Sequence, residues 1–260
     1  MASGRPVASR RAALLPGLQS PRKGVWPPAS VGQPHLFVPS QNRILTDPMQ
    51  DTFMEDSKRH LIVTQGDITL ISMPEGALVN PSNTGLILNS GGNSDNTVSN
   101  AIARRGGPFM QQTLHMARSG LRNNRLEPGR AVDTEAGQLP VKRLIHVSIV
   151  GAKKINARLV SNAILNAYDL ADELELKELA FPAIGLQMGG ITLEEFMDIF
   201  WRITAEELPR LKNVKQVYLC LFSGEEYELG SAYAEKNVDE LPESIDLEIS
   251  ESGFARGLFG

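Results

Sequence analysis

Five short apolar runs alternate with polar turn residues in the middle of the chain and predict buried strands. Each run is rich in Val, Ile, Leu or Ala and is bounded by residues typical of turns. The five predicted strands are residues 61–64, 76–80, 144–150, 179–184 and 217–222. Because most of these runs are apolar throughout, they indicate strands that helices cover on both faces of a sheet.

Helical periodicity fills two of the intervals between and after these runs. In residues 156–174 and 193–208 the apolar side chains recur every three or four positions and share one face. Thr192 and Glu195 have the spacing of a capping box, so the second helix is expected to begin at this point. The alternation of strands and helices predicts an α/β fold with a largely parallel sheet.

The two ends of the chain differ from this central part. Residues 1–58 are rich in Pro, Ser, Gly and Arg, and we expect a disordered basic extension because such a segment buries too little apolar surface. The same composition also fits an organelle transit peptide, or a start codon placed too far upstream. Residues 237–260 carry many carboxylates and are expected to form an acidic, flexible tail. The predicted domain is therefore residues 59–236.

Composition narrows the class of protein. A chain of 260 residues with 42% hydrophobic residues suffices for one packed domain, and a net charge of -4 gives no uniform footprint for wrapping nucleic acid. Cys220 is the single cysteine, so a reducing compartment is expected. The sequence contains no run of eighteen apolar residues, so no transmembrane helix is predicted. We expect a soluble, cytoplasmic protein, or an organellar one if residues 1–50 are a transit peptide.

Polar residues follow the first two predicted strands, at the sheet edge where α/β proteins bind ligands. Asp67 offers a carboxylate that can accept a hydrogen bond from the exocyclic amine of a base. Asn80 and Asn83 carry amides that suit ribose hydroxyls, and the following polar stretch, residues 84–96, contains glycines that let the backbone approach a ligand. Taken singly, each of these segments also fits an ordinary turn.

A third loop, residues 185–190, connects a predicted strand to the capped helix. It reads Gly-Leu-Gln-Met-Gly-Gly, and its amides precede the positive end of a helix dipole, where a diphosphate can bind. Neither a P-loop nor a GxGxxG sequence opening the first helix is present, which argues against kinase and dehydrogenase functions.

In order and spacing, these segments resemble the macrodomain family, whose members bind ADP-ribose and in some branches hydrolyse ADP-ribosyl linkages. The resemblance runs from about residue 63 to 227 and implies a three-layer α/β/α sandwich with a mostly parallel mixed sheet. Its carriers are Gly66-Asp67-Ile68-Thr69, Ala77-Leu78-Val79-Asn80 with Asn83, Ala101-Ile102 through Gly107-Pro108, Leu139-Pro140 leading into Leu144-Ile145-His146, and Ala180-Phe181-Pro182-Ala183-Ile184.

The resemblance also implies roles for individual residues. Asp67 and the backbone amide of Ile68 would bind adenine, Asn83 would contact the distal ribose, and the loop of residues 185–190 would wrap the diphosphate. The full set of expected ligand-binding residues is Asp67, Ile68, Asn80, Asn83, Gly91, Gly92, Gly185, Leu186, Gln187, Met188, Gly189 and Gly190.

Two departures from the family pattern concern catalysis and binding. Hydrolases of the family commonly have Val-Asp-Gly before the helix, whereas here Val98 is followed by Ser99 and the acidic residue is missing. Asp95 in the enlarged loop is a candidate to replace the missing acidic residue, so Asn83 and Asp95 are the catalytic candidates. The loop of residues 185–190 also has Leu and Gln where the family usually has a small hydroxyl residue and a glycine, which would crowd the phosphates.

The remaining candidates have structural interpretations. His146 lies in an apolar strand and is expected to be a buried, hydrogen-bonded histidine, while His115 is expected on the surface of a helix over residues 109–118. Cys220 is expected to be a small buried hydrophobe. The four histidines and one cysteine assemble no metal site, and no cofactor is expected.

Three functions remain open from the sequence. The first is a module that binds ADP-ribose or a related nucleotide, free or attached to a macromolecule. The second is a hydrolase that removes ADP-ribose from a modified protein or nucleic acid. The third is a degenerate domain that contacts protein or nucleic acid through the basic N-terminal arm or the acidic tail.

Overall fold

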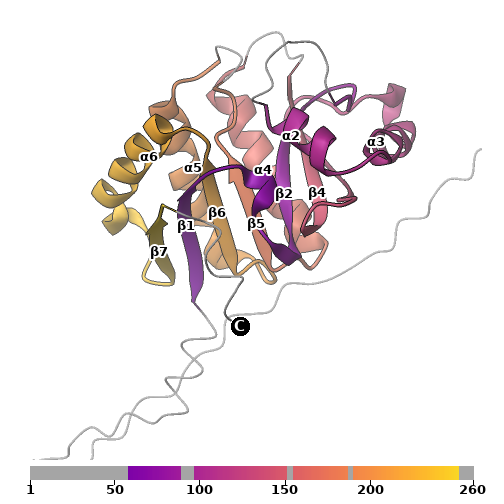
Figure 1. The fold of residues 1–260 in the computed structure, drawn as a ribbon. Coiled ribbons are helices and arrows are strands. Elements are labelled where there is room, and N and C mark those ends of the chain that lie inside the picture. The colour runs from indigo at the N-terminus through magenta and orange to yellow at the C-terminus, as the bar shows by residue number, and fades with distance from the viewer. Residues whose placement is uncertain (1–57, 89–96, 151–154, 187–189, 252–260) are drawn as a thin grey trace, which may run out of the picture. The chain divides into compact units, whose positions relative to one another are not determined.

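The computed structural model describes residues 58–88, 97–150, 155–186 and 190–251 (Figure 1). Within these ranges seven strands form one sheet in the order β3-β4-β2-β5-β6-β1-β7. Every neighbouring pair is parallel except β3 and β4, which are antiparallel. The strands are β1 (Arg59–Gln65), β2 (Met73–Asn83), β3 (Ala131–Glu135), β4 (Val141–Val150), β5 (Glu178–Pro182), β6 (Gln216–Leu221) and β7 (Ile245–Ser250).

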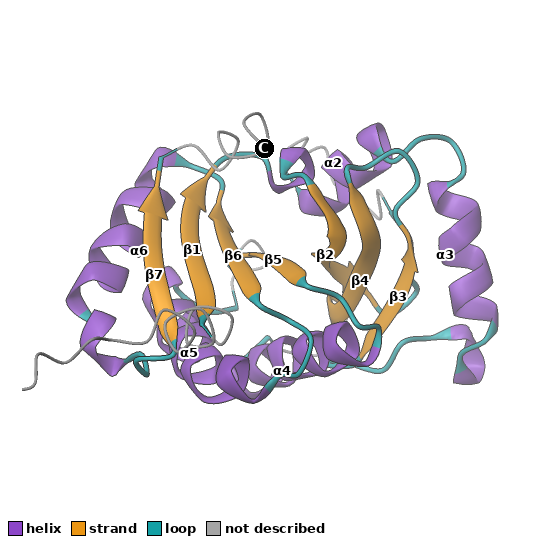
Figure 2. Ribbon diagram, turned by 90° about the horizontal axis from the view of Figure 1, so that it is seen from below, coloured by secondary structure: helices purple, strands orange, loops and turns teal. Residues whose placement is uncertain are grey.

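Helices cover both faces of this sheet, so the predicted three-layer α/β/α fold is confirmed (Figure 2). The larger core contains the aromatic cluster of Tyr168, Phe181, Phe196 and Phe200, between one face of the sheet and the helices α4 and α5. The smaller core lies on the other face, under α2 and α3. The helices are α2 (Val98–Arg105), α3 (Met110–Ser119), α4 (Ala157–Glu173), α5 (Leu193–Glu207) and α6 (Gly224–Lys236).

The predicted helices and strands agree with the structure to within a few residues at their ends. The capping box at Thr192 is present, with the Thr192 side chain accepting from the Glu195 amide and the Glu195 carboxylate accepting from the Thr192 amide. None of the helices that the structure describes has the length and apolar character needed to cross a bilayer.

The predicted boundary at residue 236 is wrong for the part of the tail that the structure describes. Residues 245–250 form β7, which pairs in parallel with β1 along its length, so the folded domain reaches to about residue 251. Apolar Ile245, Leu247 and Ile249 alternate with Asp246 and Glu248, and this period of two is the signal of a strand. The many carboxylates of this segment led to the prediction of a flexible tail in place of a strand.

Candidate functional site

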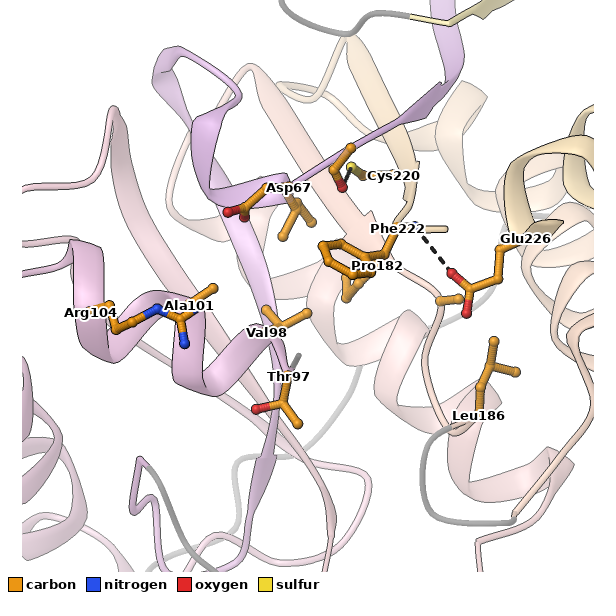
Figure 3. A pocket seen from close by; sticks show the side chains of 13 residues that line it. Asp67, Thr97, Val98, Ala101, Arg104, Pro182, Leu186, Cys220, Phe222 and Glu226 are labelled. Carbon is orange, nitrogen blue, oxygen red and sulfur yellow. Dashed lines mark hydrogen bonds between the residues drawn. The ribbon is translucent and has the colours of Figure 1, made fainter. Parts of the chain in front are cut away.

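A pocket opens beyond the carboxyl ends of β1, β5 and β6, beside α2 (Figure 3). It encloses about 750 Å³ of empty space, part of which is open solvent at its mouth. Polar lining comes from Asp67, Thr97, Arg104 and Glu226, and the apolar lining includes Val98, Ala101, Pro182, Leu186 and Phe222. Apolar walls combined with convergent polar groups are the usual form of a small-molecule site, and this pocket has both.

Asp67 reaches this pocket because the chain turns sharply after β1. Gly66 has φ +136°, in the region that favours glycine, and its carbonyl accepts a hydrogen bond from the Cys220 thiol at 3.2 Å. The Asp67 side chain then caps the short 3₁₀ helix that follows, accepting from the amide of Thr69 at 3.0 Å and from its hydroxyl at 2.6 Å. Local hydrogen bonds therefore fix one carboxylate oxygen of Asp67.

The second oxygen of Asp67 faces Arg105 in the last turn of α2. Arg105 Nε lies 3.3 Å from Asp67 Oδ2, and the neighbouring Arg104 lines the pocket itself. The Asp67 side chain remains 24% exposed. A carboxylate has about four lone-pair positions, so it can accept a further hydrogen bond from a ligand.

Phe222 supplies an aromatic wall that the sequence prediction missed. The ring lines the pocket although 55% of the residue is exposed. Its backbone amide donates to Glu226 Oε2 at 3.1 Å, and the same carboxylate belongs to the Ser223–Glu226 capping box of α6 (Figure 3). The available signal was its position, since Phe222 follows β6 at the same sheet edge as Asp67 follows β1.

The helix that presents a positive terminus to the pocket is α2. Thr97 caps α2 and lines the pocket with Val98, and the first turn of α2 contains no acidic residue. By contrast, α5 carries Glu194 and Glu195 in its first turn. These two carboxylates offset part of the positive end of α5, and the expected contact of a diphosphate with the loop before α5 stays a prediction.

Asn80 lies inside the fold and does not line the pocket, contrary to its predicted contact with a ligand. It is fully buried, its Oδ1 accepts from the Ser99 hydroxyl at 3.0 Å, and its Nδ2 lies 3.0 Å from His146 Nδ1. His146 Nε2 in turn lies 2.8 Å from the Thr134 hydroxyl. The expectation of a buried, hydrogen-bonded His146 is thus confirmed, and both ends of the Asn80 amide are used.

Asn83 holds the start of the segment that follows β2. Its Oδ1 accepts from the amides of Gly85 and Ile87, and its Nδ2 donates to the Ile87 carbonyl at 2.7 Å. These bonds explain why an asparagine is needed there without invoking a ligand. Its predicted neighbours Gly91, Gly92 and the catalytic candidate Asp95 lie outside the described residues.

Both described glycines of the third loop are explained by packing. Gly185 has φ +93°, and a Cβ on Gly190 would lie 2.4 Å from Ile155. Leu186, between these positions, lines the pocket without closing it. Gln187, Met188 and Gly189 lie outside the described residues, so their predicted contacts with phosphate stay predictions.

Cys220 also lines the pocket, yet it is only 3% exposed, as a small buried hydrophobe should be. Burial, and to a smaller extent the charge of Asp67, raises the pKa of its thiol to about 12. The thiol is therefore protonated at neutral pH and is not an activated nucleophile. His115 is exposed on α3, as expected.

Comparison with known proteins identifies the family. The model of the Macro domain matches residues 79–200. A macro domain-containing protein of Caldanaerobacter subterraneus is 31% identical over 182 residues, covering 68% of this chain and 98% of that protein. The chain belongs to the Macro domain family.

Two further proteins that are similar to this chain concern ADP-ribose, one through its name and the other through its bound ligand. An O-acetyl-ADP-ribose deacetylase of Cronobacter sakazakii is 32% identical over 168 residues, which is 64% of this chain and 88% of that protein. A variant of the Oceanobacillus iheyensis macrodomain, solved with ADPR, superposes with a TM-score of 0.60 at 23% identity and covers 68% of this chain and 94% of that one. The second comparison supports the fold.

Proposed function

We propose that the pocket binds ADP-ribose or a closely related adenine nucleotide, free or attached to a macromolecule, with the base between Asp67 and Phe222. The observation that carries this proposal is the presence of a fixed carboxylate and an exposed aromatic ring in one pocket. Membership of the Macro domain family and the ADPR-bound structural relative support it.

The chemistry of the base suits these two side chains. The exocyclic amine of adenine donates hydrogen bonds, and Asp67 has an acceptor oxygen that local bonds to Thr69 leave available. Stacking of a base on an aromatic side chain is worth about 1–3 kcal/mol. Phe222 therefore supplies binding energy, and Asp67 supplies discrimination against bases that lack an amine at this position.

The diphosphate of such a ligand needs positive charge. At this pocket that charge comes from the N-terminus of α2, whose first turn is free of acidic side chains, and from Arg104 on the same helix. Val98, Ala101 and Pro182 belong to the apolar part of the lining, which lowers the local dielectric and strengthens these interactions. The pocket thus combines a site for a base with a site for an anion.

Calorimetry with ADP-ribose tests the proposal through Asp67→Asn. Asn keeps the shape and the capping hydrogen bonds of Asp67 but loses its charge, and hydrogen bonds to charged groups are worth about 1.5–3 kcal/mol. We expect Kd to rise about tenfold or more. Asp246→Asn on β7 makes the same charge change and should leave Kd unchanged. Absence of heat with the native chain at millimolar ADP-ribose would refute the proposal.

Hydrolysis at the distal ribose is the second candidate function, favoured by the similarity to a protein named O-acetyl-ADP-ribose deacetylase. Attack of water on such a bond needs a group to orient or deprotonate it. Ser99 is at the position where family hydrolases have an aspartate, and its hydroxyl donates to Asn80. Asn83 and Asp95 are therefore the residues that would orient or deprotonate the water. Release of ADP-ribose from a modified substrate should drop in Asn83→Ala and Asp95→Ala; unchanged rates in both would exclude this site.

A further inference from the structure

Charge is strongly polarised along the folded part of the chain. Residues 97–130 contain six arginines and one carboxylate, whereas residues 224–251 contain ten carboxylates and one lysine. The net charge of -4 conceals this separation because the two regions offset each other. Such a distribution creates a directional field that orients a charged partner.

The two charged regions lie at opposite ends of the sheet. Helices α2 and α3 lie at the end formed by β3, β4 and β2, whereas α6 and β7 lie at the other end (Figure 1). The nucleotide pocket lies between them, beyond β5, β6 and β1. A polyanion that approaches the pocket is therefore attracted on the α2 and α3 side and repelled on the side of α6.

Five arginines of the basic region form what we call the arginine face. Four of them are exposed and Arg118 is half-buried, with its guanidinium 3.5 Å from the carbonyl of Gly85. The Leu126 amide donates to the Thr84 carbonyl at 2.9 Å, which places the neighbouring arginines against the segment that follows Asn83. The arginine face consists of Arg104, Arg105, Arg118, Arg122 and Arg125.

The arginine face reaches the pocket at one end. Arg104 lines the pocket and Arg105 contacts Asp67, while no carboxylate in the described part of the chain forms an ion pair with Arg118, Arg122 or Arg125. Each guanidinium presents a planar fork of donors that matches two phosphate oxygens. The arrangement therefore suits several phosphates in succession.

We propose that the arginine face binds the phosphate backbone of a nucleic acid. Between Arg122 and Arg125, Asn123 and Asn124 adopt positive φ of 54° and 53° and expose two amides, which add neutral donors beside the charged ones. Protein contacts to nucleic-acid backbones are made largely by arginine, lysine and such amide groups. The surface goes beyond the proposed nucleotide pocket and involves different side chains at its outer end.

The position of the arginine face has a further meaning if the pocket binds ADP-ribose, and this step rests on the proposed function. A nucleic-acid strand held by Arg104 and the other members of the arginine face would lie beside the pocket, because Arg104 lines the pocket wall. An ADP-ribosyl group attached to that strand would then enter the pocket while its carrier stays on the arginine face. The natural carrier would accordingly be a nucleic acid.

The test measures binding of a fluorescent oligonucleotide that carries no ADP-ribose to the full chain, over a series of salt concentrations. Each neutralised phosphate contributes about 0.9 to the slope of log K against log salt for duplex DNA and about 0.7 for single strands. We expect Arg122→Glu combined with Arg125→Glu to weaken binding at least tenfold at low salt and to reduce the slope by about 2. The melting temperature of the variant confirms that it is folded.

Two control variants and a second polyanion, poly-glutamate, test whether the arginine face itself holds the oligonucleotide. Arg202→Glu with Arg210→Glu makes the same charge change on exposed arginines of α5 and the turn after it, and should leave binding within about twofold. Asp67→Asn should weaken ADP-ribose binding without weakening oligonucleotide binding, because it removes only a carboxylate beside Arg105. Failure of one proposal is thereby distinguished from failure of the other. The proposal would be overturned if the two double-arginine variants lost oligonucleotide binding equally, or if neither variant changed it. It would also be overturned if binding by the native chain did not depend on salt, or if poly-glutamate bound as tightly as the oligonucleotide.

Discussion

At the scale of single residues, a chain of buried hydrogen bonds fixes the protonation of His146. The Asn80 oxygen accepts from Ser99, so the Asn80 amide group donates to His146 Nδ1, and the proton of the neutral imidazole must lie on Nε2, facing Thr134. An imidazolium has no lone pair to accept the Asn80 donor. Burial accordingly lowers the pKa of His146 to about 4, with a smaller opposing effect of Asp133.

This lowered pKa predicts a specific loss of stability in acid. The unfolded chain binds a proton at His146 below its ordinary pKa of 6.5, whereas the folded chain does not until about 4. The stability contributed by the neutral His146 is complete above pH 6.5 and is lost as the pH falls from 6.5 to 4. Between these two values the free energy of unfolding decreases by about 1.4 kcal/mol per pH unit. Urea unfolding at pH 7 and pH 5 should show this decrease in the free energy of unfolding in the native chain and not in His146→Gln.

The exposed histidine of α3 provides the control. His115→Gln should retain the pH dependence of the native chain, because His115 is exposed and no described hydrogen bond involves its ring. An unfolding free energy that changes equally with pH in the native chain and in His146→Gln would contradict the proposed origin of the effect.

At the scale of elements, the central strands and the helices α4 and α5 were predictable because local pattern and tertiary role agree. Continuous apolar runs became strands buried on both faces, and the Thr192 capping box set the start of α5. The strand β3 was missed because it contains the half-buried Asp133 and the exposed Glu135 and because, within the described residues, it pairs only with β4. Short edge strands carry the weakest sequence signal.

The strand β7 gives a prediction at this scale. Ile245 is 6% exposed and packs into the larger core, so Ile245→Ala should lower the free energy of unfolding by about 2 kcal/mol or more. The neighbouring Asp246 pairs with Lys58 at the surface, and Asp246→Ala should cost less than about 1 kcal/mol. Equal effects of the two substitutions in urea unfolding would show that β7 does not belong to the folded domain.

At the scale of the whole molecule, the sequence located the sheet edge of the pocket and not all of its walls. Asp67 was found because it directly follows a recognisable strand, whereas Phe222, Thr97 and Arg104 come to it from elements far apart in the chain. Asn80 looked equally suitable and proved internal, since only the packed fold decides which side of β2 meets solvent. Local pattern therefore predicts the neighbourhood of a site, and tertiary packing selects its members.

The composition of β7 also bears on how copies of this protein meet one another. An edge strand exposes backbone donors and acceptors that another chain can extend into a continuous sheet. On β7, Asp246 and Glu248 alternate with apolar residues, and β7 is only six residues long. A second molecule docking edge to edge would bring like charges together, so this border resists self-association and aggregation while β1 stays covered.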